Sequence, residues 1–143
     1  MKVGFTGTQR GLTDYQIKVL QGLLALLAGV EFHHGDCIGA DSKAHSLARA
    51  AGMVIVIHPP KNPTKRAWRR GDRETEAKDY LVRNRAIVDE TDWLLACPGE
   101  GKEQLRSGTW STVRWARRAG KRITIILPEA DHEEVIEDSG ETR

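Results

Sequence analysis

DWLLACPGEGKEQLRSGTWSTVRWARRAG, residues 92–120, is the stretch that indicates the fold most directly. The run Trp93–Cys97 is short and apolar, as a buried strand is, and Pro98 and Gly99 end it. After a polar loop, Ser107–Thr109 begin a helix with apolar positions at three-residue spacing, and Gly120 ends that helix. A strand, a small-residue turn and a helix N-terminus form an anion site, because unpaired backbone N–H groups face the turn. The stretch therefore predicts a phosphate bound at Ser107–Thr109.

Four further apolar runs are predicted to be strands, with helical patterns between them. They are Lys2–Gly7, Val30–His34, Met53–His58 and Ile123–Leu127. One helix is expected over residues 74–90, directly before the strand at 93–97. This alternation predicts an α/β fold: a single-domain, Rossmann-like, five-stranded and mainly parallel sheet in the order 3-2-1-4-5, with helices on both faces. The domain is expected over residues 1–128 and an acidic C-terminal tail over 129–143, with a short helix at 131–137.

Three turns that contain glycine follow predicted strands, at residues 7–11, 35–39 and 98–109. Parallel strands end at one edge of the sheet, where folds of this kind bind their ligands. Turn conformation alone explains one such turn, but three on one edge favour contact with a ligand. The predicted contacts at this edge are Gly7, Thr8, Gln9, Arg10, Gly35, Asp36, Gly39, Asp41, Pro98, Gly99, Arg106, Ser107, Gly108 and Thr109.

Asp36 has two interpretations of similar weight. At the end of a strand it is placed to hold a ribose hydroxyl, as acidic residues do in dinucleotide-binding folds. Alternatively it caps the following helix, although Asp41 is better placed for that role. The sequence leaves both interpretations open.

Neither a metal site nor a disulfide is expected, and no cofactor is predicted. His33 and His34 are adjacent in a predicted strand and point to opposite faces, which argues against a shared ion. His45 and His58 have no ligand spacing either. The two cysteines follow strands that flank strand 1, so they should lie about 10 Å apart, beyond the reach of about 7 Å for a disulfide. Both are expected to be free thiols.

The composition suits one domain outside the membrane. The chain has 143 residues, 29% of them charged, and a net charge of +2. The charge is uneven, because residues 61–85 contain nine basic and four acidic side chains. Within this segment, Lys61–Arg73 is expected to be a mobile loop of the lid type, in which Trp68 is able to stack on a base. With two cysteines, no apolar run of membrane-spanning length and no signal-peptide pattern, a cytoplasmic location without membrane contact is expected.

Four segments of the chain resemble the SLOG superfamily, which joins the DNA-processing protein Smf/DprA with the Lonely Guy (LOG) phosphoribohydrolases. The segments are GFTGTQR (4–10), HHGDCIGADSKAHSLARAAG (33–52), RNRAIVDETDWLLACPG (83–99) and RSGTWSTVRWARRAGK (106–121). The likeness is greatest to the small YspA/YpsA-related members, which phages or mobile elements often encode. The resemblance implies a Rossmann-like fold that binds a nucleotide, a nucleotide-derived signal or single-stranded DNA, and a homodimer or larger assembly.

The motifs of the LOG enzymes are only partly present. Those enzymes carry an Arg-Lys pair ahead of the fourth strand and a PGGxGTxxE motif after it. By this resemblance Arg83 takes the arginine position and contacts the ligand together with Asn84, which replaces the lysine. Thr112 stands where the catalytic glutamate would follow, and threonine cannot act as a carboxylate acid or base near neutral pH. The remaining candidates for catalysis are Arg83, Asp36, Glu100 and Glu103.

The first functional hypothesis is a protein that binds a nucleotide or a nucleotide-like phosphate ligand, with or without processing it. The alternatives are a DprA-like single-stranded nucleic-acid binder that uses Lys61–Arg73, a LOG-like nucleotide N-glycosidase, and a scaffold with a vestigial pocket. The sequence does not decide between a binder and an enzyme.

Overall fold

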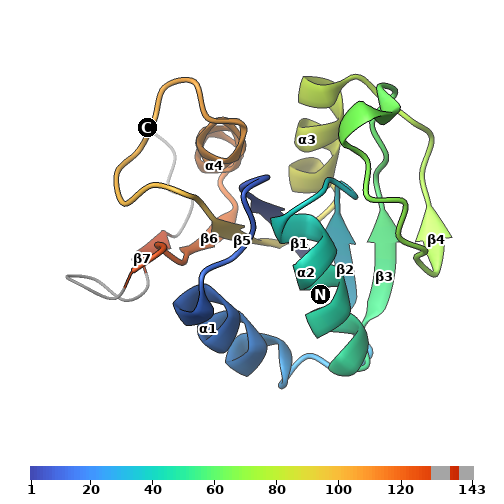
Figure 1. The fold of residues 1–143 in the computed structure, drawn as a ribbon, viewed down its shortest axis with the longest axis horizontal. Coiled ribbons are helices and arrows are strands. Elements are labelled where there is room, and N and C mark those ends of the chain that lie inside the picture. Colours follow the sequence, from blue (N-terminus) through green and yellow to red (C-terminus); the bar gives the residue numbers. More distant parts are fainter. Residues whose placement is uncertain (130–135, 139–143) are drawn as a thin grey trace.

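The computed structural model describes residues 1–129 and 136–138 of the chain. They form three layers, with a sheet between two pairs of helices (Figure 1). The strands are β1 (Lys2–Gly7), β2 (Glu31–His34), β3 (Val54–Ile57), β4 (Arg73–Glu74), β5 (Trp93–Cys97), β6 (Arg122–Ile125) and β7 (Ile136–Asp138). The helices are α1 (Asp14–Leu24), α2 (Ala40–Ala50), α3 (Tyr80–Asp89) and α4 (Gly108–Arg118), with a short 3-10 helix, η1, at Pro63–Lys65. In the described part of the chain, no helix is long and apolar enough to cross a membrane.

The sheet order is β4-β3-β2-β1-β5-β6-β7, and β7 alone runs antiparallel to its neighbour. The predicted strands correspond to β1, β2, β3, β5 and β6 and occur in the predicted order. The predicted number of five is wrong, because each edge carries one further strand. β4 consists of two exposed, charged residues and β7 lies within the predicted acidic tail, so neither has the long apolar run of a buried strand. β7 also occupies part of the helix expected at 131–137, and the rest of that helix lies outside the described residues.

Apolar side chains cover both faces of the sheet, as the continuous apolar runs predict. On one face Phe5 and Phe32 pack with the buried residues of α1 and α2. On the other face Leu94 and Ala96 pack with those of α4. Leu94 and Leu95 are neighbours in β5 yet belong to opposite cores, because successive side chains of a strand alternate. The carboxyl ends of β1 and β5 therefore open between the two helical layers.

Gln16 joins the start of α1 to the carboxyl edge of the sheet. Its backbone N–H donates to the Thr13 hydroxyl and its side-chain oxygen accepts from the Thr13 N–H, both at 3.1 Å, which is a capping box. The side-chain amide of Gln16 also donates to the carbonyl oxygens of Pro98 and Ile126, at 2.8 and 2.9 Å. The Gln16 side chain is fully buried, so it connects α1 to the ends of β5 and β6 without help from water.

Asp36 anchors the segment between β3 and α3. Its carboxylate accepts from Arg66 Nε at 2.7 Å and from the Arg69 backbone N–H at 2.9 Å, and its carbonyl accepts from the Ala67 N–H at 2.7 Å. The prediction that Lys61–Arg73 is a lid with few anchors is therefore wrong. Polar contacts supply the anchors that apolar side chains do not.

Helix α3 begins at Tyr80 and not at residue 74 as expected. The residues before it follow the end of β3: the Thr75 N–H donates to the Ile57 carbonyl at 2.9 Å, and the Lys78 N–H donates to the Pro59 carbonyl at 3.2 Å. These bonds hold residues 74–79 against the sheet edge, so their backbone groups are not available for a helix.

Gln16→Leu is expected to lower the free energy of unfolding by about 3 kcal/mol. The change removes the side-chain half of the capping box and leaves two buried carbonyls without donors, and each such loss costs about 1–3 kcal/mol. Chemical denaturation measures the effect, with Gln21→Leu, an exposed position of the same helix, as the control. A loss no larger than that of the control would show that the Gln16 amide does not hold the strand ends.

Candidate functional site

A cleft of about 290 Å³ opens at the carboxyl ends of β1 and β5. The helix after β1 covers one face of the sheet and the helix after β5 covers the other, so the cleft lies where the chain switches faces (Figure 1). Ligands of doubly wound sheets bind at such points. The cleft is lined by Gly7, Thr8, Gln9, Arg10, Tyr80, Glu100, Ser107, Gly108 and Thr109.

The N-terminus of α4 forms one wall of the cleft. Ser107 caps this helix, because its hydroxyl accepts the Trp110 N–H at 3.2 Å. The first N–H groups of a helix have no carbonyl partner within it, and here they belong to residues such as Gly108 and Thr109 that line the cleft. With the partial positive charge of the helix end, this wall favours an anionic group.

Tyr80 reaches the cleft from the first residue of α3. A side chain at Gly108 would collide with the Tyr80 hydroxyl, so Gly108 gives Tyr80 its room. Tyr80 is absent from the predicted contacts, because a helix that starts at residue 74 places it in mid-helix and available for the core. Only the later start of α3 brings the ring to the sheet edge.

An ion pair forms the rim of the cleft. Arg10 Nη2 lies 2.6 Å from Glu100 Oε2, and the Arg10 side chain is 67% exposed. The other carboxylate oxygen of Glu100 is buried and has no hydrogen-bond partner among the residues that the structure describes. An exposed pair of this kind contributes at most about 1 kcal/mol, so Arg10 can turn to another anion at small cost. Gly99 shapes the same rim, since a side chain there would collide with Arg10.

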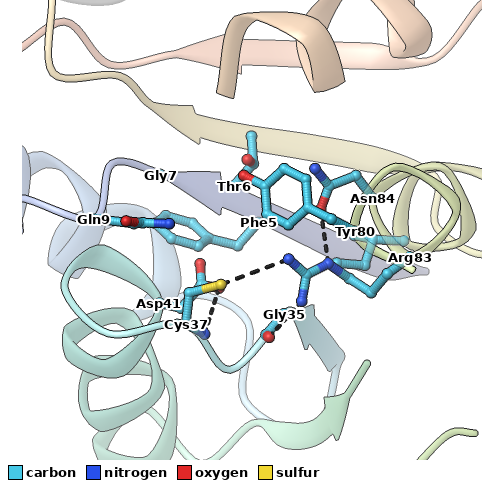
Figure 2. A pocket seen from close by; sticks show the side chains of 11 residues that line it. Phe5, Thr6, Gly7, Gln9, Gly35, Cys37, Asp41, Tyr80, Arg83 and Asn84 are labelled. Atoms are coloured by element: carbon cyan, nitrogen blue, oxygen red, sulfur yellow. Dashed lines mark hydrogen bonds between the residues drawn. The ribbon is translucent and has the colours of Figure 1, made fainter. Parts of the chain in front are cut away.

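Behind Tyr80 a smaller cavity of about 20 Å³, enough for one water molecule, continues toward α3. Tyr80, Gly7 and Gln9 line both cavities, so the two adjoin. Figure 2 shows the lining of the inner one, which consists of Phe5, Thr6, Gly7, Gln9, Gly35, Cys37, Asp41, Tyr80, Arg83, Asn84 and Ile87.

Arg83 is a buried cation whose hydrogen-bond acceptors are neutral. Its side chain is 2% exposed and donates to the Gly35 carbonyl at 2.6 Å, to Asn84 Oδ1 at 2.7 Å and to the His58 carbonyl at 3.1 Å. A weaker contact at 3.5 Å joins it to Cys37 Sγ (Figure 2). Within residues 1–129 and 136–138, no carboxylate lies within ion-pair distance of this guanidinium. The charge is therefore solvated by neutral groups, and Asp41, whose pKa burial raises and the Arg83 charge lowers, lies in the same cavity without an ion pair to it.

Asp41 and Cys37 complete the inner cavity. Burial raises the pKa of Asp41 to about 6, and the Cys37 N–H, which donates to the carboxylate at 3.1 Å, offsets this only in part. Burial and the neighbouring Asp41 raise the pKa of the Cys37 thiol. The thiol stays protonated near neutral pH, so Cys37 is not activated as a nucleophile. Both cysteines, Cys37 and Cys97, are free and buried, as expected.

Several predicted ligand contacts line neither cavity: Asp36, Gly39, Pro98, Gly99 and Arg106. Arg66 and Arg69 occupy both carboxylate oxygens of Asp36, so the ribose interpretation is not supported, and the acid that lines a cavity is Asp41. The capping alternative for Asp36 also fails, because Gly39 is the N-cap of α2 and has no side-chain cap. Gly39 has a φ of 88° and packs against the backbone of Gln9, so its role is conformational.

The carboxylate candidates for catalysis are spread apart. Glu103 accepts from Arg114 and Arg117 of α4, each at 3.0 Å, and does not line the cleft. The Thr112 hydroxyl donates to the Gly108 carbonyl at 2.8 Å, and Thr112 lines a separate groove between α3 and α4. Of the predicted carboxylates, Glu100 alone remains at the cleft.

Four buried histidines form two pairs that the sequence analysis did not anticipate. His34 Nε2 lies 2.9 Å from His45 Nδ1 on the side of α2, and His33 Nδ1 lies 2.8 Å from His58 Nε2 on the side of α3. Burial lowers the pKa of all four, that of His45 to about 4 and that of His58 to about 3, so they are neutral near pH 7. The prediction considered His33 together with its chain neighbour His34, whereas its spatial neighbour is His58, directly after β3.

No family model matches this chain, and no curated protein matches it by sequence. Solved structures do match. The molybdenum cofactor binding protein from the phototrophic bacterium Rippkaea orientalis aligns with 90% of this chain and 78% of its own, at 22% identity and a TM-score of 0.69. DNA processing protein A from Helicobacter pylori, described for its single-stranded DNA binding mode, aligns with 98% of this chain and 69% of its own, at 22% identity and a TM-score of 0.68. The protein TM1055 aligns with 86% of this chain and 72% of its own, at 18% identity and a TM-score of 0.64.

Likeness at these identities establishes the fold and not the ligand. The chain therefore has an α/β, Rossmann-like fold with a parallel sheet and helices, as the alternation of apolar runs and helical patterns predicts.

Proposed function

We propose that this protein binds a nucleotide or a nucleotide-derived phosphate ligand in the cleft at the ends of β1 and β5. The observation that carries the proposal is the meeting of two anion-attracting features in adjoining cavities, the N-terminus of α4 and the buried guanidinium of Arg83. A volume of about 290 Å³ is at the lower end of small-molecule pockets, which run from about 300 to 1,000 Å³. That size suits a mononucleotide better than a dinucleotide.

The proposed orientation follows from the chemistry of the walls. The phosphate accepts from the backbone N–H groups of Gly108 and Thr109, and Arg10 turns from Glu100 to pair with it. The ring of Tyr80 offers a flat face for the base. Asp41 lies behind it in the inner cavity.

Neighbours of this fold support a ligand-binding role, since one is named for binding a molybdenum cofactor and another for single-stranded DNA. A cytoplasmic location, an origin in a phage or mobile element and a homo-oligomeric state are further parts of the proposal. The free thiols support the first of these. The exposed Leu81 and Val82 on α3 support the oligomer.

Gly108→Val is expected to weaken the binding of AMP by at least about 10-fold, or 1.4 kcal/mol, while the protein stays folded. The added side chain displaces Tyr80 and crowds the N–H groups at the start of α4. Calorimetry measures the affinity, and Gly101→Val is the control, because a side chain at Gly101 meets no atom within 4 Å. Equal affinities in the two folded variants would remove this turn from the site.

Glu100→Gln is expected to bind AMP several-fold more tightly than the wild type. The change removes the negative charge of Glu100, which competes with the phosphate for Arg10 and repels the phosphate. Glu103→Gln is the control, because Glu103 pairs with arginines of α4 away from the cleft.

The same pair of variants tests for hydrolysis. We expect no free base by chromatography from any of the three proteins, because Thr112 supplies no carboxylate and does not line the cleft. Base release by the wild type that disappears in Glu100→Gln would contradict the binder and make Glu100 the acid of an N-glycosidase.

A DprA-like single-stranded nucleic-acid binder is the second candidate, and Trp68 favours it. Its side chain is 62% exposed, and the Arg66 guanidinium lies 4.2 Å from the ring centroid. The backbone of Trp68 has a φ of 61°, a conformation uncommon outside glycine, so the exposure is a feature of the fold. An aromatic ring beside arginines is a platform on which bases stack.

If this second candidate is correct, Trp68→Ala weakens binding of a single-stranded oligonucleotide by about 1–3 kcal/mol for each stacked base. Fluorescence anisotropy measures the affinity, and its steep decrease with salt marks contact with the backbone phosphates. Trp115→Ala is the matched control, because that ring also carries an arginine, Arg85, at 4.3 Å. Weak binding that neither variant changes would leave the cleft as the binding site.

A further inference from the structure

Two histidines from neighbouring strands face each other beneath the end of α3. His33 belongs to β2 and His58 directly follows β3, and His33 Nδ1 lies 2.8 Å from His58 Nε2. Both side chains are at most 1% exposed. Glu90, the C-cap of α3, places Oε1 4.0 Å from His58 Nε2, and one ligand atom of each of the three residues lies within 4.8 Å of the others. None of the three lines the cleft.

Glu31 determines which nitrogen of His33 is available. His33 Nε2 lies 2.8 Å from Glu31 Oε1, so Nε2 carries the proton and donates to the carboxylate. The lone pair of His33 is then on Nδ1, which faces His58. A carboxylate that holds the far nitrogen of an imidazole is the usual support of a metal-ligating histidine, since it fixes the ring and its tautomer.

The spacing of the three groups needs little change to admit an ion. A tetrahedral zinc ion about 2.0–2.1 Å from each nitrogen holds the two nitrogens about 3.4 Å apart. The rings of His33 and His58 therefore have to separate by roughly half an ångström from their present 2.8 Å. Glu90 is able to close its longer distance, because its side chain is 45% exposed and rotates freely.

The two buried histidine pairs differ in how many ring nitrogens are used, and His58 uses only Nε2. Its Nδ1 is buried and has no hydrogen-bond partner in the described part of the molecule. The other pair differs, because His34 bonds through both ring nitrogens: Nε2 contacts His45, and Nδ1 accepts the Asp36 N–H at 2.9 Å. Among the described residues, no carboxylate lies close enough to His34 and His45 to bind a metal ion together with them.

We propose that His33, His58 and Glu90 form a binding site for a divalent transition-metal ion, with zinc as the ion that this ligand set suits best. Two imidazoles and one carboxylate are a common ligand set of zinc, and three protein ligands leave the fourth position to water. The site is linked to the inner cavity, because the carbonyl of His58 accepts from Arg83, which lines that cavity, at 3.1 Å. The prediction argued against a metal ion shared by His33 and His34, because their side chains point to opposite faces. It did not consider His33 together with His58, whose ring nitrogens face each other.

The experiment uses the full chain, purified without a histidine tag and freed of metal by chelation. Calorimetry with Zn²⁺ is expected to show one site per chain, and Co²⁺ is expected to give the visible absorption of a four-coordinate ion. Glu90→Gln tests the site at an exposed residue, where folding is not at risk, and should weaken zinc binding at least 10-fold. Glu31→Gln should weaken it about 10- to 100-fold, because it removes the partner that orients His33.

His58→Asn and His45→Gln form a matched pair, since each removes one member of a buried histidine pair on opposite faces of the sheet. We expect His58→Asn to abolish the site and His45→Gln to retain it. Absence of one-to-one zinc binding by the folded wild type would overturn the proposal. Zinc binding that Glu90→Gln leaves unchanged, or that His45→Gln removes, would do the same.

Discussion

The buried guanidinium of Arg83 is the interaction on which the carboxyl edge of the sheet depends. It binds the carbonyl of Gly35 after β2, the carbonyl of His58 after β3, and Asn84 within α3, so one side chain joins three elements. Hydrogen bonds to a charged group are worth about 1.5–3 kcal/mol each, and a buried charge that loses its partners costs more. Gly35 fits this position because any side chain there would collide with the guanidinium. The strand ends are thus held in register around a cation, and the cavity beside it keeps its shape.

This arrangement requires α3 to begin close to the sheet edge. The polar segment before it meets that requirement, because Asp36 binds Arg66 and residues 74–79 follow the end of β3. The segment that the sequence describes as a lid is therefore part of the scaffold. It places Tyr80 at the first residue of α3, where the side chain lines both the cleft and the inner cavity.

The buried strands and their order could be predicted from the sequence, because apolar runs and helical patterns are local signals. The edge strand β4 and the start of α3 could not, because they depend on polar partners far along the chain, such as Arg66 with Asp36. The same distinction holds within the site. Gly7 and Ser107–Thr109 were found through the chemistry of strand ends and helix starts, whereas Tyr80 reached the cleft only through the position of α3. Neither interpretation of Asp36 included its partners Arg66 and Arg69, which lie 30 and 33 residues away along the chain.

The balance of charge at this edge favours holding an anion over cleaving it. Arg10, Arg83 and the N-terminus of α4 attract negative charge, and the opposing carboxylates are Glu100, which is already paired, and Asp41. The pKa of about 6 would suit Asp41 to acid catalysis, but it lines a cavity with room for one water molecule behind Tyr80. A general acid must come within hydrogen-bond distance of the leaving atom, directly or through one water. A ligand in the outer cleft meets Arg10 and the N-terminus of α4. The acid at that cleft is Glu100, which is paired with Arg10, whereas Asp41 lines the inner cavity. This distribution of charge supports the proposed binding of an anionic ligand at the cleft.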